Sequence, residues 1–124
     1  MTSPKGALAI QTLAMPTTTN PSGDIFGGWI LSQMDLSAGI LAKRISKGRA
    51  ATIAVDGMSF LKPVHVGNLV SCYVTLMKQG QTSMTIAVEV WSEDLSAAIR
   101  HKVTEGVFVF VAIDEHGVKR KIPT

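Results

Sequence analysis

One carboxylate lies in the middle of a predicted apolar helix, and its chemistry is the first question that the sequence raises. Asp35 lies inside "GDIFGGWILSQMDLSAGILAKR", which begins at Gly23. Steps of three and four residues place it on a helix face whose other members are all small: Gly28, Ser32, Gly39 and Ala42. Another backbone or a slender ligand can approach such a strip closely. Asp35 is therefore either a hydrogen-bonded structural acid or a reactive group, and reactive carboxylates cluster at functional sites.

A pair of glycines occupies the predicted first turn of the same helix, where each costs up to about 1 kcal/mol relative to alanine. The first N–H groups of a helix have no partner within it, and glycine leaves them sterically open. Gly27 and Gly28 could therefore hold a carbonyl oxygen or a developing oxyanion. Tight packing of the helix on a sheet is the alternative explanation for both.

The helix that must position these groups is predicted between a polar loop and a basic end. A first strand is expected at residues 7–15, followed by the turn-forming loop 16–23. Asp24 is the expected N-cap, the helix should run to about Lys47, and Gly48 should supply the left-handed residue after it. The side opposite Asp35 carries larger apolar residues that can fill a core: Ile30, Met34, Leu41 and Ile45.

After Gly48 the sequence becomes rich in β-branched and aromatic residues, and turn signals divide it into four strands. The expected strand regions are residues 49–64, 66–80, 81–93 and 97–117. Tight turns are predicted at residues 78–81 and 114–117. Short connections favour antiparallel pairing, and the single long helix must be covered by the sheet. The chain, residues 1–124, is therefore predicted to be one α+β domain.

Composition limits the class of ligand and the location of the protein. A net charge of +3 suits a ligand that carries several phosphates as well as it suits nucleic acid. Cys72 is the only cysteine, which excludes an intrachain disulfide, and it is expected to be buried. The N-terminus lacks the apolar run of a signal peptide, so the cytoplasm is the expected location.

A membrane span, a metal site and a nucleotide-binding loop are not expected. Residues 25–42 are long enough to span a bilayer, but a central aspartate would cost roughly 2.5–3.5 kcal/mol there. His65, His101 and His116 are scattered without ligand spacing, so no metal site is predicted. The stretch "GDIFGG" lacks the lysine and the spacing of phosphate-binding loops.

At these residues the sequence resembles the YciA-type hotdog-fold acyl-CoA thioesterases. The resemblance covers nearly the whole chain, in "TLAMPTTTNPSGDIFGGWILSQMD", "FLKPVHVGNLV", "VEVW", "VTEGVFVFVAID" and the final "IP". It implies a hotdog fold, in which a long central helix is wrapped by a five-stranded antiparallel sheet. The implied activity is hydrolysis of acyl-CoA thioesters to CoA and a carboxylic acid, in fatty acid metabolism, and the strand and helix order read from the pattern agrees with that fold.

The resemblance also implies roles for particular residues. Asp35 would be the general base or the nucleophile, and the backbone N–H near Gly28 would polarise the thioester carbonyl, with Gly27 beside it. Asn20 would come from the other subunit of a homodimer, and three dimers would form a homohexamer. CoA belongs to the substrate and product, so no cofactor or metal is expected. The candidates for its phosphates are basic residues: Lys62, Arg100, Lys102, Lys119 and Arg120, with the Lys119–Arg120 tail preferred.

Two other hotdog functions remain as alternatives. A non-catalytic acyl-CoA-binding regulator would need a DNA-binding segment, and no stretch of this sequence supplies one. A dehydratase acting on acyl-carrier-protein substrates would need a histidine in the loop or the helix, where the sequence has none. Neither acyl-chain preference nor the physiological substrate follows from the sequence.

Overall fold

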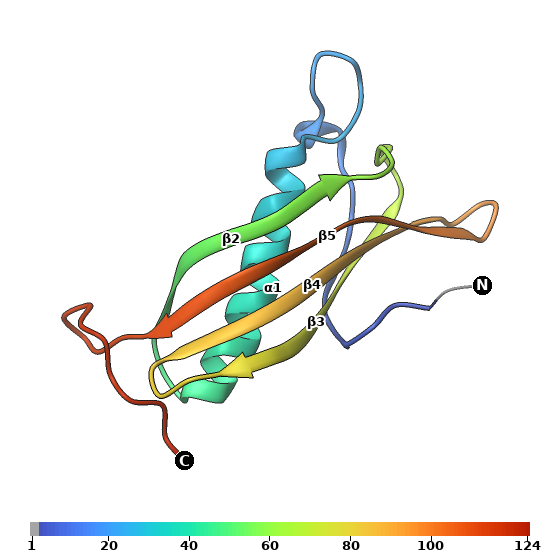
Figure 1. Cartoon of the computed structure of the whole chain (residues 1–124). Coiled ribbons are helices and arrows are strands. Elements are labelled where there is room, and N and C mark those ends of the chain that lie inside the picture. The colour runs from blue at the N-terminus through green and yellow to red at the C-terminus, as the bar shows by residue number, and fades with distance from the viewer. Residues whose placement is uncertain (1–2) are drawn as a thin grey trace.

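The protein consists of one long helix held in the concave side of a curved sheet, as the computed structural model of residues 3–124 shows (Figure 1). Its elements are β1 (Ala7–Leu13), a 3₁₀ turn (Pro16–Thr18), α1 (Gly27–Ser46), β2 (Ala50–Phe60), β3 (Leu69–Gln79), β4 (Ser83–Asp94) and β5 (Ile99–Ala112). The strand order in the sheet is β1-β3-β4-β5-β2, and every pairing is antiparallel. The predicted helix and five-stranded antiparallel sheet are confirmed.

The core lies between one face of α1 and the concave face of the sheet. Ile30 and Met34 are buried as predicted, and Leu41 and Ile45 pack against the same cluster while partly exposed. From β4, the alternating residues Ile86, Val88 and Val90 supply the opposite wall, each at most 1% exposed. This burial of apolar side chains from both elements is the main term that fixes the helix on the sheet.

The helix begins two residues later than the sequence predicts. Asp24 is not the N-cap; this position belongs to Phe26, and no side chain caps the helix. The reason is tertiary: Ile25 bridges Thr19, and its N–H donates to the Val64 carbonyl (3.0 Å), which keeps this stretch extended. Asp24 instead lies 3.3 Å from Nδ1 of His65.

The left-handed residue at the helix end is Lys47 (φ 56°), and the assignment of that role to Gly48 is wrong. The Lys47 N–H donates to the Lys43 carbonyl, which closes the last turn. Gly48 serves another purpose, because a Cβ there would come within 2.7 Å of Nη2 of Arg120. This glycine makes room for a guanidinium rather than for a turn.

Strand β2 is an edge strand of the sheet, and no other strand in residues 3–124 pairs with its outer side. None of its residues is buried, and Ile53 and Val55 are 57% and 44% exposed. On the neighbouring surface of α1, Leu36 is also 57% exposed. An unpaired, apolar strand edge beside an apolar helix surface is a ready template for another chain.

Candidate active site

Asp35 lies in a cavity of about 330 Å³ between α1 and β2. Four residues of α1, two of β2 and one of β5 line it: Gly28, Leu31, Ser32, Asp35, Thr52, Val55 and Phe108. Phe108 is fully buried, and it faces Val55 across the β2–β5 pairing. Of the predicted strip of small residues, Gly28 and Ser32 line this largely apolar cavity, in which Asp35 is the ionisable group. Ala42 is instead buried in the core, and Gly39 lies against Phe110.

A hydrogen bond from the sheet holds the carboxylate in place. The Thr52 hydroxyl donates to Oδ1 of Asp35 at 2.6 Å, and no donor in residues 3–124 binds Oδ2. One oxygen is thus anchored and the other is left for a ligand. Thr52 is not predicted as a site residue from the sequence, where its only signal is a hydroxyl within the apolar stretch "AATIAV".

The two glycines of the first turn differ in their surroundings. A Cβ on Gly27 would come within 3.3 Å of the Phe60 ring, so this glycine permits close packing. A Cβ on Gly28 would meet nothing within 4 Å, so its backbone faces open space in the cavity that holds Asp35. Of the two glycines, Gly28 has the free approach that an oxyanion contact requires.

Asn20 lies in a second cavity, of about 370 Å³, together with Gly27 and Lys62. Its Oδ1 accepts hydrogen bonds from the N–H groups of Ser22 (2.9 Å) and Asp24 (3.1 Å). The carbonyl oxygen of this side chain therefore shapes the loop before α1. Within one chain the structure does not bring Asn20 and Asp35 into the same cavity.

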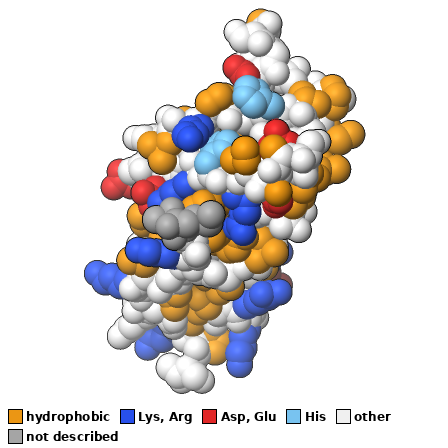
Figure 2. All heavy atoms as spheres, turned by 90° about the vertical axis from the view of Figure 1, so that its right-hand side faces the viewer, with side chains coloured by type: hydrophobic (Ala, Val, Ile, Leu, Met, Phe, Trp, Pro, Cys, Tyr) orange, Lys and Arg blue, Asp and Glu red, His pale blue; other side chains and the backbone are white. Residues whose placement is uncertain are grey.

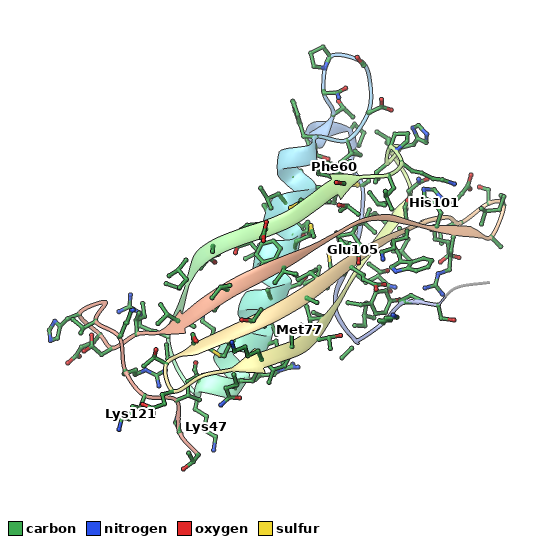
Figure 3. All side chains as sticks on the ribbon, viewed as in Figure 1. Lys47, Phe60, Met77, His101, Glu105 and Lys121 are labelled. Carbon is green, nitrogen blue, oxygen red and sulfur yellow. The ribbon has the colours of Figure 1, made fainter. Side chains whose placement is uncertain are left out.

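The basic candidates are spread over both ends of the molecule. Arg120 donates to the carbonyls of Ser46 (2.9 Å), Ile113 (2.8 Å) and Arg49 (3.2 Å), and so caps the C-terminal end of α1. Ser46 is about 16 Å from Asp35 along the helix, at 1.5 Å per residue. Figure 3 shows Lys47 and Lys121 at this end, opposite Phe60 and His101, and exposed Lys119 belongs to the same C-terminal segment.

Two further basic side chains lie on the convex face of the sheet, away from α1. Arg100 donates to the Tyr73 hydroxyl (3.3 Å), and its guanidinium carbon is 5.7 Å from the centre of the Trp91 ring. Lys102 forms ion pairs with Glu105 (3.0 Å) and Glu89 (3.6 Å). Neither residue approaches Asp35 within its own chain.

The remaining reactive groups do not suggest another catalytic centre. Cys72 is buried as predicted, and burial raises the pKa of its thiol to about 11, although a hydrogen bond with Ser37 partly offsets this. In residues 3–124 no group of three or more His, Cys, Asp or Glu side chains could hold a metal ion. No helix in that range is long and apolar enough to cross a membrane.

The geometry fits attack on an activated acyl group. A carboxylate with one anchored and one free oxygen can accept a proton from water or attack a carbonyl carbon directly. The open N–H at Gly28 can donate a hydrogen bond to the carbonyl oxygen as negative charge develops on it. The apolar lining from Leu31, Val55 and Phe108 suits a hydrocarbon chain.

Comparisons with known proteins point in the same direction. The sequence model of the thioesterase superfamily matches residues 22–99. The acyl-CoA thioester hydrolase YciA of Salmonella typhimurium is 49% identical over 123 residues, which cover 97% of this chain and 92% of that protein.

Solved structures of similar chains agree in shape. A hexameric thioesterase from Yersinia pestis has 51% sequence identity and a TM-score of 0.95, with 98% of this chain and 99% of that chain covered. A hexameric broad-specificity acyl-coenzyme A thioesterase has 49% identity and a TM-score of 0.95, with 99% and 85% covered. That enzyme has also been solved as an aspartate-to-alanine variant.

Proposed function

Because this chain belongs to the thioesterase superfamily and has the hotdog fold, we propose that it hydrolyses acyl-CoA thioesters with Asp35 as its reactive carboxylate. It is an acyl-CoA thioesterase, a hydrolase whose relatives at about half identity carry this activity in their names. The observation that carries the assignment of Asp35 is its anchored Oδ1 and free Oδ2 in an apolar cavity. The alternative of a non-catalytic acyl-CoA-binding regulator is set aside, since no feature of the site favours it.

The proposed reaction needs water and groups of the protein only. Water attacks the thioester carbonyl while Asp35 accepts its proton, and a C–O bond forms. The N–H at Gly28 stabilises the tetrahedral oxyanion, which then collapses with cleavage of the C–S bond. The CoA sulfur takes the proton and leaves. CoA enters as part of the substrate, and we propose that no separate cofactor takes part.

A covalent route uses the same atoms in another order. An Asp35 oxygen would attack the carbonyl carbon and expel CoA as its thiolate, which takes a proton from water, leaving a mixed anhydride between enzyme and acyl group. Water would then hydrolyse the anhydride. Both routes require a carboxylate that is held firmly in one orientation. The hydrogen bond from the Thr52 hydroxyl provides this restraint.

The complete site requires a second copy of the chain. Hexameric relatives and the uncovered strand β2 support a homodimer that assembles further into a homohexamer. Since Asn20 and Asp35 lie in different cavities of one chain, we propose that Asn20 reaches Asp35 from the partner subunit and holds the water or the thioester. The cytoplasmic location stays a prediction, based on the single cysteine and the N-terminal sequence.

The assay for this function is release of free thiol from a series of acyl-CoA substrates of increasing chain length. Hydrolysis of several of them with a measurable kcat/KM is the expected result. If no acyl-CoA is hydrolysed while CoA still binds, the regulator becomes the better interpretation.

Replacing Thr52 by Val should lower kcat by about 10- to 100-fold, because the carboxylate loses its anchor and samples unproductive orientations. KM should change little, since Thr52 acts through Asp35. Thr52→Ser keeps the hydroxyl and should restore most of the rate. Steady-state kinetics on one acyl-CoA measures all three proteins, and equal rates in the Val and Ser variants would contradict the anchoring role.

The acyl cavity makes a second prediction, on chain length. Val55 lines the cavity and is 44% exposed in the isolated chain, so Val55→Ala should enlarge the cavity without unfolding the core. The ratio of kcat/KM for long over short acyl-CoA substrates should rise about tenfold, as expected for a change of a few carbon atoms in an apolar pocket. Ile99→Ala, at the remote β4–β5 hairpin, is the control. An unchanged ratio in Val55→Ala would place the acyl chain elsewhere.

A further inference from the structure

Strand β2 turns side chains toward α1 at intervals that a regular strand does not allow. Thr52 binds Asp35, Val55 lines the cavity of that carboxylate, and the ring of Phe60 lies against Gly27. In a regular strand, residues on one face are separated by even steps. The step from Thr52 to Val55 is three residues and the step from Val55 to Phe60 is five. The alternation of β2 therefore changes phase twice.

Two β-bulges cause these changes of phase. The register of β2 on β5 shifts between Thr52 and Ala54, and again between Asp56 and Ser59. An extra residue in one strand turns the side chains that follow it to the other face, and such bulges are common beside active sites. At the second bulge Gly57 has a φ of 69°, and its N–H donates to Oδ1 of Asp56 at 2.8 Å.

The side chain that the second bulge turns inward is Met58. It is half-buried and packs against the hydrophobic core. Its Cγ lies 2.7 Å from the position that a Cβ on Gly106 would take, and Cε of Met34 lies 3.5 Å from the same position. Gly106 of β5 therefore leaves the space in which Met58 of β2 and Met34 of α1 meet.

Met58 lies between two cavities. On β2, Val55 lines the acyl cavity of about 330 Å³, and Phe60 lines the cavity of about 370 Å³ at the start of α1. Met58 comes between these two residues, faces α1 as they do, and lines neither cavity. On α1, the adjacent residues Leu31 and Ile30 line the first and the second cavity respectively, so the two cavities are close neighbours. Met58 is thus part of the partition between them.

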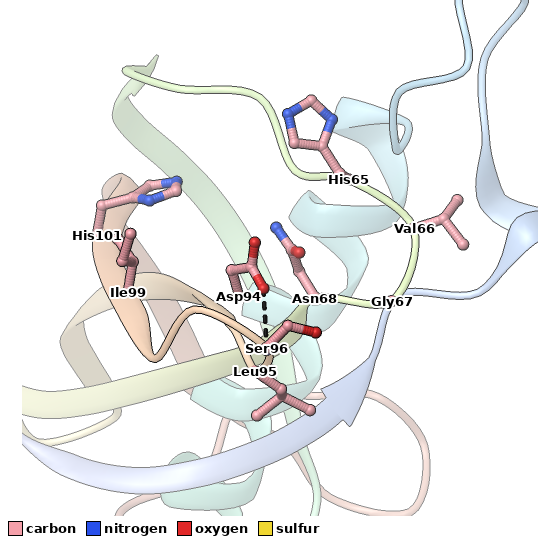
Figure 4. A pocket seen from close by; sticks show the side chains of 9 residues that line it. All are labelled: His65, Val66, Gly67, Asn68, Asp94, Leu95, Ser96, Ile99 and His101. Atoms are coloured by element: carbon pink, nitrogen blue, oxygen red, sulfur yellow. Dashed lines mark hydrogen bonds between the residues drawn. The ribbon is translucent and has the colours of Figure 1, made fainter.

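A third cavity, of about 430 Å³, is not adjacent to this partition. Its walls come from the β2–β3 connection and from the ends of β4 and β5 with their hairpin, and polar side chains such as His65, Asp94 and His101 lie among them (Figure 4). Figure 2 shows two histidine side chains on the surface, with acidic and basic side chains near them. A hydrocarbon chain that outgrows the acyl cavity is therefore expected to pass Met58 rather than enter this polar cavity.

We propose that Met58 closes the acyl cavity on the side of the start of α1 and so determines which acyl chains the enzyme accepts. This inference rests on the proposed function, which places the thioester at Asp35 and Gly28. A chain that is too long for the acyl cavity must displace the Met58 side chain to reach the second cavity. Methionine is unbranched and has three rotatable bonds, so this side chain can move aside. Long chains are then hydrolysed with a lower kcat/KM than chains that fit.

The test measures kcat/KM for acyl-CoA substrates of increasing chain length in variants that open or narrow the partition. Met58→Ala joins the two cavities, so the ratio of kcat/KM for long over short chains should rise about tenfold. Gly106→Ala adds a methyl group 2.7 Å from Cγ of Met58 and pushes that side chain into the passage, so the same ratio should fall. Met77→Ala, at a methionine of β3 that is 62% exposed, is the matched control and should keep the wild-type ratio.

Two further variants separate specificity from loss of structure. Met58→Leu keeps the volume of the side chain and should keep the wild-type ratio. Met58→Ile introduces a stiff, β-branched side chain without changing Gly106, and it should lower the ratio even if Gly106→Ala does not fold. Thermal unfolding and the oligomer mass of each variant show that the fold and the assembly are intact.

An unchanged or lower ratio in folded Met58→Ala would overturn the inference. An equal change of kcat/KM at every chain length would also overturn it, because Met58 would then contact the part that all acyl-CoA substrates share. Failure of the proposed function looks different, because the wild-type protein would then hydrolyse no acyl-CoA of any length.

Discussion

Replacing Asp35 by Asn is expected to lower kcat for acyl-CoA hydrolysis by about 10³-fold, the middle of the range for loss of a general base. Asn has nearly the shape of Asp and can still accept the Thr52 hydrogen bond at its carbonyl oxygen. What it loses is the ability to accept a proton from water or to attack the thioester. The fold, the assembly and the affinity for CoA should therefore be retained, and only turnover should fall.

The measurement is thiol release under saturating substrate, with CoA affinity and oligomer mass determined on the same preparation. Glu115→Gln, which neutralises an exposed carboxylate in the remote turn at residues 114–117, is the matched control and should keep the wild-type rate. A kcat within threefold of wild type in Asp35→Asn would remove Asp35 from the mechanism.

Experiments on the wild-type enzyme can decide whether Asp35 acts as a general base or as a nucleophile. In water enriched in ¹⁸O, a mixed anhydride that is hydrolysed at the Asp35 carbon places ¹⁸O in the Asp35 side chain. Mass spectrometry of the peptide that contains Asp35, after many turnovers, detects this label. Label in Asp35 identifies the covalent route, because the general-base route cannot place ¹⁸O in this side chain.

Placing charges on the uncovered surface of β2 and α1 is the second change with a large expected effect. In the double variant Ile53→Asp with Leu36→Asp, two side chains that are each 57% exposed in the single chain become carboxylates. A single chain can tolerate them, but a dimer through this surface would have to bury unpaired charges, which costs several kcal/mol. The expected result is loss of the hexamer and a fall in kcat/KM of at least 100-fold.

Mass measurement in solution and thiol release test this together. Assembly and activity should be lost together, because each site would receive Asn20 from the partner subunit. A separated chain keeps Asp35 but does not have a complete site. Val118→Asp, at an equally exposed apolar residue (59%) near the C-terminus, is the control. Hexamers with full activity in the double variant would show that the interface lies on another surface.

Local patterns in the sequence were sufficient for the elements and for one candidate catalytic residue. The period of three and four residues placed Asp35 on one face with Gly28 and Ser32 and placed Ile30 and Met34 on the other, and the structure has these residues in the cavity and in the core respectively. These features follow from the geometry of a single helix or strand, which a few neighbouring residues determine.

Contacts between distant residues decided what the sequence left open or missed. The helix starts at Gly27 rather than after Asp24 because Val64 and Thr19 hold Ile25 extended, and Gly48 is needed by Arg120, which is 72 residues away in the chain. Thr52 joins the site only because β2 lies beside α1. Among five basic candidates, only packing shows that Arg120, Lys102 and Arg100 are engaged within the protein. Local periodicity carries no information on such long-range contacts, which depend on how the elements pack.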